Sequence, residues 1–95
     1  MLPARLSAAR LREIAERRGL DEKQFSQVTG LSRNEARRYL SRDVTASPHI
    51  VTRLLDTLHV TPEILFENPD VALAWKLMAE GEARLRRQNL GEVIQ

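Results

Sequence analysis

Three capping residues, each followed by proline, divide this chain more firmly than any other feature. The pairs are Ser47-Pro48, Thr61-Pro62 and Asn68-Pro69. Ser, Thr and Asn side chains accept a hydrogen bond from an N–H of the first helical turn. Proline suits the first helical position because the N–H that it lacks would have no partner there. Each pair therefore predicts a helix that begins at its proline.

Further residues that start or stop helices complete the division. Ser32 is expected to cap a helix, and Gly30 and Gly91 fall where helices should end, because glycine accepts the left-handed conformation. His59 is expected to end the fourth helix. No segment alternates apolar and polar residues long enough to predict a strand. The predicted helices cover residues 5–18, 22–29, 33–41, 48–58, 62–67 and 70–89.

The apolar residues recur at helical spacing and predict one small all-α core. Ile50, Leu54 and Leu58 lie four residues apart, which is typical of a buried helix face. The gaps between helices are assigned to Leu20, Leu31, Val60, Ile64 and Leu65. A chain of 95 residues is expected to form one domain, or one domain and a terminal element.

Several functional classes are excluded by composition. The chain has no cysteine, so it cannot hold a disulfide framework or a thiolate zinc site. His49 and His59 have no metal-ligand spacing, and neither a nucleophile constellation nor a phosphate-binding glycine loop is present. No apolar run approaches the roughly 18 residues of a membrane span. We therefore expect a cytoplasmic protein that is not an enzyme and has no metal and no cofactor.

Positive charge is concentrated in the helix predicted at residues 33–41 and in the residue that follows it. Residues 33–42 carry four Arg against Glu35, whereas residues 43–70 carry five acidic residues against Arg53. The molecule is therefore expected to be polarised, with a basic face that attracts phosphates.

The polar face of the segment 33–41 carries side chains that can distinguish base pairs. At helical spacing one face holds Arg33, Asn34, Arg37 and Arg38. Arg can donate two hydrogen bonds to guanine O6 and N7, and Asn can bond adenine N6 and N7. Because a partner helix at 22–29 would hold this helix at an angle, the pair is suited to the major groove.

From residue 11 to residue 66 the chain resembles the phage-repressor-like (Xre/Cro-type) helix-turn-helix regulators. The segments that carry the resemblance are LREIAERRGL, DEKQFSQVTG, LSRNEARRYLSR and SPHIVTRLLDTLHVTPEILF. It implies a five-helix repressor-like bundle over residues 1–68, to which residues 69–95 add an extra C-terminal helix. It also implies a transcriptional repressor that binds double-stranded DNA by placing helix 33–41 in the major groove.

The resemblance further implies roles for individual residues. Base edges are assigned to Arg33, Asn34, Arg37 and Arg38. Phosphates are assigned to Ser32, Lys23, Arg42, and the loop residues Thr45 and Ser47. The family often has Gln at the start of the second helix, where this chain has Glu22. A carboxylate beside a phosphate is unfavourable, so Glu22 is the residue that fits DNA binding least well.

The helix predicted beyond residue 70 leaves three alternatives open. Its apolar residues are Val71, Trp75, Met78 and Leu85. They can pack on their own domain, form a homodimer, or dock a protein partner such as a toxin or a regulator. A dimer would read paired half-sites on DNA. With a toxin as partner, the chain would be an antitoxin that autoregulates its promoter. Besides the repressor and the antitoxin, a third possible function is a helix-turn-helix that contacts only protein.

Overall fold

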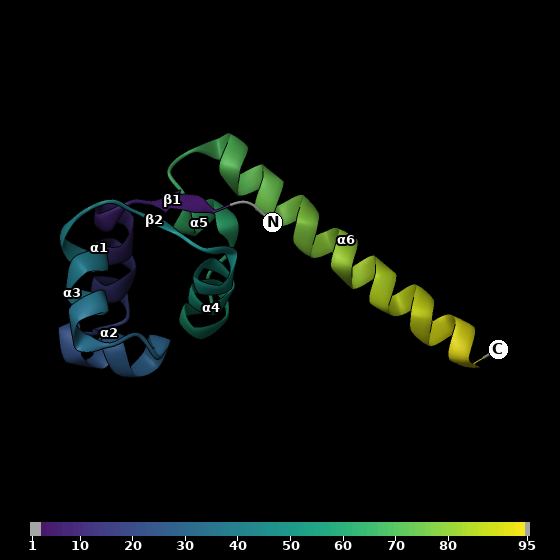
Figure 1. Cartoon of the computed structure of the whole chain (residues 1–95), viewed down its shortest axis with the longest axis horizontal. Helices are drawn as coiled ribbons and strands as arrows, with labels where there is room; N and C mark the ends of the chain where they lie inside the picture. Colours follow the sequence, from purple (N-terminus) through teal and green to yellow (C-terminus); the bar gives the residue numbers. More distant parts are fainter. Residues whose placement is uncertain (1–2, 95) are drawn as a thin grey trace.

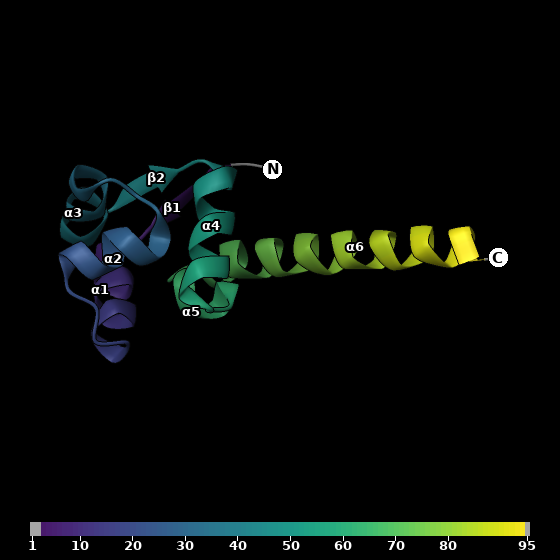
Figure 2. The same cartoon turned by 90° about the horizontal axis from the view of Figure 1, so that it is seen from below.

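The structure is a computed structural model that describes the backbone of residues 3–94 and the side chains of residues 3–81. The elements are β1 (Ala4–Leu6), α1 (Ala8–Arg17), α2 (Glu22–Thr29), α3 (Arg33–Ser41), β2 (Val44–Ala46), α4 (Pro48–Leu58), α5 (Pro62–Leu65) and α6 (Pro69–Ile94). Figures 1 and 2 show α1 to α5 gathered around one centre while α6 projects away from it. This projection gives the molecule its extents of 50 × 27 × 22 Å.

A small antiparallel sheet corrects the expectation of a purely helical chain. The pairs in register are Ala4 with Ala46, Arg5 with Thr45 and Leu6 with Val44. Each strand has only 3 residues, which is too short for an alternating pattern to predict it. The prediction of a first helix from residue 5 is therefore wrong. That helix begins at Ala8, where the Ser7 hydroxyl accepts a hydrogen bond from the Arg10 N–H.

The three helix starts predicted at capping residues before proline are confirmed. The helices α4, α5 and α6 begin at Pro48, Pro62 and Pro69. The Asn68 side chain accepts a hydrogen bond from the N–H of Asp70 at 2.9 Å. The Ser47 hydroxyl accepts from the Ile50 N–H at the start of α4, whereas Thr61 makes no side-chain cap bond at the start of α5.

Two of the predicted helix ends are confirmed and one is wrong. Gly30 and His59 adopt left-handed conformations, with φ of 76° and 53°, at the ends of α2 and α4. Gly91 does not end α6, which continues to Ile94. Gly30 and His59 tolerate the left-handed conformation, which lets the chain turn back toward the core after α2 and α4.

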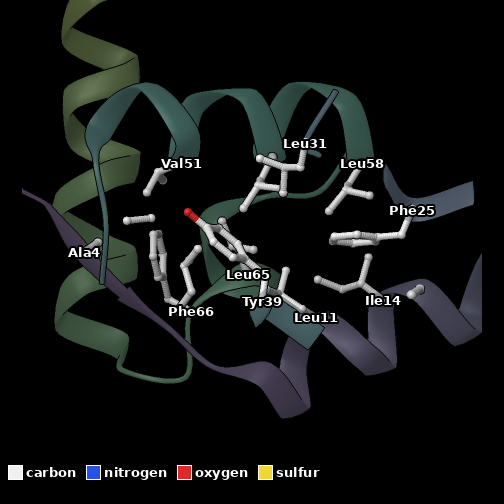
Figure 3. Packing of buried hydrophobic residues seen from close by; sticks show 14 of the residues in the cluster. Ala4, Leu11, Ile14, Phe25, Leu31, Tyr39, Val51, Leu58, Leu65 and Phe66 are labelled. Atoms are coloured by element: carbon white, nitrogen blue, oxygen red, sulfur yellow. The ribbon is translucent and has the colours of Figure 1, made fainter. Parts of the chain in front are cut away.

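A single hydrophobic core joins the short helices, the sheet and the start of α6 (Figure 3). Its largest fully buried side chains are Phe25, Leu6, Leu11, Leu54, Leu58, Leu65 and Val51. Leu6 was not expected there because its strand was not predicted. Ile64 was assigned to the core but is 41% exposed, because the single turn of α5 places only Leu65 inward.

The beginning of α6 belongs to this core, and the rest of the helix leaves it. Ala72 and Trp75 are buried, and the Trp75 ring lies 6.2 Å from the Phe66 ring between centroids. Leu73 and Leu77 face outward, with exposures of 53% and 57%. Although α6 has 26 residues, no helix in the described part of the chain combines the length and apolarity needed to cross a membrane.

Candidate nucleic-acid interface

The turn between α2 and α3 is held by buried hydroxyl groups. Ser26 Oγ donates to the Leu31 carbonyl at 2.6 Å. Thr29 Oγ1 donates to the Phe25 carbonyl at 2.7 Å and accepts from the Leu31 N–H at 3.3 Å. Ser26 and Thr29 are both buried. The angle between the two helices is therefore set by hydrogen bonds as well as by the left-handed Gly30.

The far end of α3 is tied to α1 by two charged residues. Arg12 Nη1 donates to the Leu40 carbonyl at 2.8 Å. The carboxylate of Asp43 accepts from the Ala8 N–H at 3.0 Å and lies 3.8 Å from Arg5. A cation at a helix C-terminus and an anion at a helix N-terminus are both favourable. Sequence reasoning missed these contacts because their partners are 28 and 35 residues apart.

The exposed side of α3 brings the four predicted base-contacting residues together. Ala36 and Tyr39 are buried against the domain, while the outward side chains are those of Arg33, Asn34, Arg37 and Arg38. Asn34, Arg37 and Arg38 also line one surface hollow with Ser41 and Arg42. The helix thus presents donors outward from a backbone that is fixed at both ends; their contact with DNA remains a prediction.

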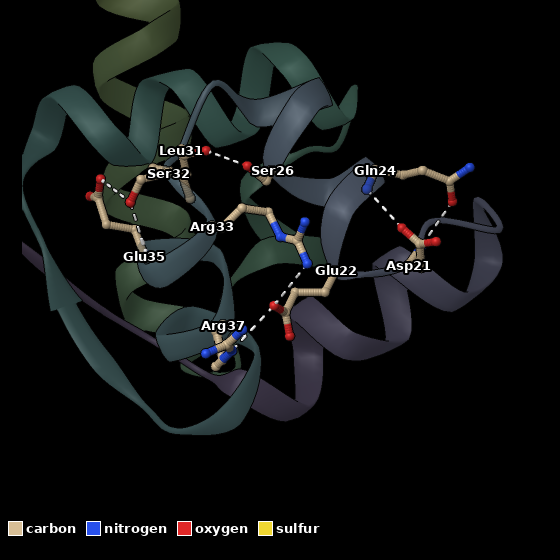
Figure 4. Close-up of polar contacts among 9 residues, drawn as sticks. All are labelled: Asp21, Glu22, Gln24, Ser26, Leu31, Ser32, Arg33, Glu35 and Arg37. Carbon is tan, nitrogen blue, oxygen red and sulfur yellow. Dashed lines mark hydrogen bonds and ion pairs between the residues drawn. The ribbon is translucent and has the colours of Figure 1, made fainter.

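Glu22 contacts two of the arginines of this surface, Arg33 and Arg37 (Figure 4). Its Oε1 atom lies 3.2 Å from Arg37 Nε and 3.7 Å from Arg33 Nη2. Among the side chains that the structure describes, Arg38 and Arg42 have no ion pair. The Arg38 guanidinium instead lies 5.5 Å from the centroid of the Tyr39 ring, within cation–π range. The carboxylate that fitted DNA binding least well is therefore directed at two of the candidate reading residues.

The residues predicted to contact phosphates lie on several elements, and all are exposed. Lys23 is in α2, Ser32 caps α3, Arg42 follows α3, Thr45 is in β2 and Ser47 caps α4. Thr45 therefore lies in a strand and not in a loop, which corrects the expectation. The Ser32 hydroxyl already accepts from the Glu35 N–H and donates to the Glu35 carboxylate, both at 3.1 Å.

The residues predicted for an interface on α6 have different surroundings. Trp75 is buried on its own domain, whereas Val71 and Met78 are half-buried. These three line an open groove of about 470 Å³ beside β1, together with Arg5. Leu85 lies outside the residues whose side chains are described.

The family comparison covers the part of the chain that forms this surface. Residues 8–65, from the start of α1 to the end of α5, match the family model described as a helix-turn-helix domain. No curated protein and no solved structure matches the chain. The matched segment is more than half of the 95 residues. The chain therefore belongs to the helix-turn-helix domain family of DNA-binding proteins.

Proposed function

We propose that this protein is a sequence-specific transcriptional repressor of the Xre/Cro type, which acts from the cytoplasm by occluding a promoter. The observation that carries the proposal is the exposed face of α3, with Arg33, Asn34, Arg37 and Arg38 side by side. Because both ends of α3 are fixed to α1 and α2, these side chains can be presented to DNA with little loss of backbone freedom.

In the proposed complex α3 occupies the major groove, which is wide enough for a helix. The arginines donate to guanine O6 and N7, and Asn34 bonds adenine. Lys23, Arg42 and Thr45 are exposed around α3 and contact phosphates on either side of it. Phosphate contacts would set the register of the protein on the duplex, while the base contacts would select the sequence.

The test is selection of bound duplexes from a random DNA pool, followed by binding measurements at several salt concentrations. We expect one enriched sequence, bound with an affinity that falls linearly on a log–log plot against salt. Absence of any enriched sequence would reject sequence-specific recognition. Binding that does not change with salt would reject the electrostatic role of the basic face.

We further propose that α6 pairs two copies of the chain. Val71, Met78 and Leu85 recur every seven residues, a spacing that suits two helices packed side by side. Val71 and Met78 line the open groove on α6, and the projection of the helix leaves room for a second copy (Figure 2). A two-fold dimer would place two α3 helices on neighbouring half-sites.

Sedimentation equilibrium tests the dimer. We expect Met78→Asp to shift the protein toward monomer and to weaken binding to a palindromic site. Leu77→Asp is the matched control, because Leu77 is next to Met78 but lies outside the groove. A wild-type protein that stays monomeric at the concentrations where it binds DNA would reject the dimer.

The second candidate function is that of an antitoxin, and the projecting helix α6 is the observation that favours it. In this case α6 would neutralise a toxin and the helix-turn-helix would repress the shared promoter. A co-transcribed toxin-like gene beside this one would support the antitoxin. A divergent promoter with an inverted repeat would support the simple repressor.

A further inference from the structure

Glu22 makes a contact that the proposed reading of DNA does not require. We propose that Glu22 restrains Arg33 and Arg37 and thereby lowers the affinity for DNA of arbitrary sequence, which makes it a specificity-determining residue. This inference rests on the proposed DNA-binding function. It concerns the balance between specific and non-specific binding at that same surface.

The geometry places one carboxylate between the two guanidinium groups. Arg33 and Arg37 are four residues apart on α3, so their side chains lie on the same side of the helix. The Nε–H of Arg37 donates to Glu22 Oε1 at 3.2 Å, and Arg33 Nη2 lies 3.7 Å from the same oxygen. The Glu22 side chain is 35% exposed, against 54% for Arg33 and 63% for Arg37. The carboxylate is therefore the more enclosed member of the cluster.

Folding stability is a weak reason for this cluster, because exposed ion pairs contribute little to it. The main effect of the cluster is on what the two arginines can bind. A phosphate that takes either guanidinium has to displace the carboxylate, and it is repelled by that negative charge at short range. Guanine offers two acceptors without a net charge, so this repulsion does not act on base contacts in the same way.

Glu22 also changes the start of α2. The N–H groups that open a helix attract anions. Glu22 is the first residue of α2 and follows the capping residue Asp21. Two carboxylates at this helix start make its N–H groups a poor phosphate site, whereas Arg38 and Arg42 make no ion pair among the described side chains. Non-specific binding is dominated by phosphate contacts, so it is reduced more than specific binding.

The experiment compares Glu22→Gln with Glu13→Gln. The first change keeps the shape of the side chain and removes the charge beside Arg33 and Arg37. The second removes the same charge from an exposed i, i+4 pair with Arg17 at 2.7 Å. Glu13 lines a different hollow, beside Leu58 on the α4 side of the domain. Affinities of both variants and of the wild type are measured on a random duplex and on a selected site at several salt concentrations.

We expect Glu22→Gln to bind random DNA about three- to tenfold more tightly than the wild type, with a smaller ratio of specific to random affinity. The salt slope on random DNA should steepen by about 0.9 for each additional phosphate that the variant neutralises. In free protein, the NMR signal of the Arg37 Nε–H should also move, because this group loses its charged acceptor. Glu22→Ala, which removes the same carboxylate, should act in the same direction.

Three outcomes would overturn the proposal. Equal changes in Glu22→Gln and Glu13→Gln would mean that only net charge matters. Weaker binding of Glu22→Gln to both duplexes would mean that Glu22 assists recognition. An undiminished effect of Glu22→Gln in the Arg33→Ala/Arg37→Ala background would show that it does not act through these arginines. If the wild type binds neither duplex, the DNA-binding function itself fails, and this inference fails with it.

Discussion

The helix-turn-helix unit of residues 21–42 and the helix α6 differ in how their own domain supports them. The turn of the first is held by Ser26 and Thr29, and the end of α3 is tied to α1 through Arg12. By contrast, α6 has an anchored beginning, around Trp75, and then projects from the domain (Figure 1). The position of the helix-turn-helix unit is thus fixed by contacts within the domain. Most of α6, by contrast, extends beyond the domain.

This difference indicates where each element can act. A reading helix has to hold its donors at defined positions, which requires support along one side and at both ends. A projecting helix offers surface to a second molecule, and its apolar residues lower the free energy only when that molecule covers them. We therefore expect mutations in residues 21–42 to change DNA binding, and mutations in the projecting part of α6 to change assembly.

The largest expected effect tests whether the start of α6 is part of the core. Trp75→Ala should lower the free energy of unfolding by about 3–5 kcal/mol, because a buried ring packed on Phe66 is lost. Denaturant unfolding measures this. Leu77→Ala, at an exposed position of the same helix, should cost less than about 0.5 kcal/mol. Similar losses for the two variants would remove the distinction between the anchored and exposed faces of α6.

A smaller effect is expected at the reading face of α3. Arg38→Ala should cost about 1–3 kcal/mol of binding free energy on the selected site and relax the base preference there. The free energy of unfolding should change little, because Arg38 is exposed. Binding to a panel of single-base variants measures the preference. Equal losses on the selected site and on random DNA would assign Arg38 to phosphate instead.

The buried turn of the helix-turn-helix unit should respond more weakly. Ser26→Ala removes the hydrogen bond to the Leu31 carbonyl, which should cost about 1 kcal/mol of stability. Ser41→Ala, which loses a bond on the exposed side of α3, is the control and should cost less. If thermal unfolding ranks the two variants in the opposite order, the turn is not held by its buried hydroxyl.

The smallest effect concerns the link between α5 and α6. The N–H of Glu63, the Thr61 hydroxyl and Lys76 lower the pKa of Glu63 below its usual value of 4.5. Since the folded-state pKa is the lower one, the stabilisation is present above the unfolded-state pKa and is lost as the pH falls through the folded-state value. Unfolding measured from about pH 6 down to about pH 3 should show a slightly smaller loss of stability for Glu63→Gln. Glu16→Gln, on α1, is the control; an identical acid response in both variants would reject the contribution of Glu63.

Features that depend on residues close together in the sequence could be predicted, and features that join distant segments could not. The helix starts at Pro48, Pro62 and Pro69, the turn at Gly30 and the exposed side of α3 depend on neighbouring residues, and the local pattern predicts them correctly. The β1–β2 pairing and the bond from Arg12 to the Leu40 carbonyl join distant segments, so no local pattern reveals them. Glu22 is intermediate: the sequence marked it as unfavourable beside a phosphate, but only the structure shows that it contacts Arg33 and Arg37.

The register of the two-stranded sheet also bears on how the chain folds. The helices α2 and α3 are close in sequence, so their contacts require the closure of only a short loop. Pairing of Ala4 with Ala46 closes a loop of the chain that contains the first three helices, because α1, α2 and α3 come between the two strands in the sequence. Closing that longer loop costs more chain entropy, and non-local pairing slows folding. We expect the helix pair to form early in folding and the sheet to form late, so that the strand before α1 completes the domain.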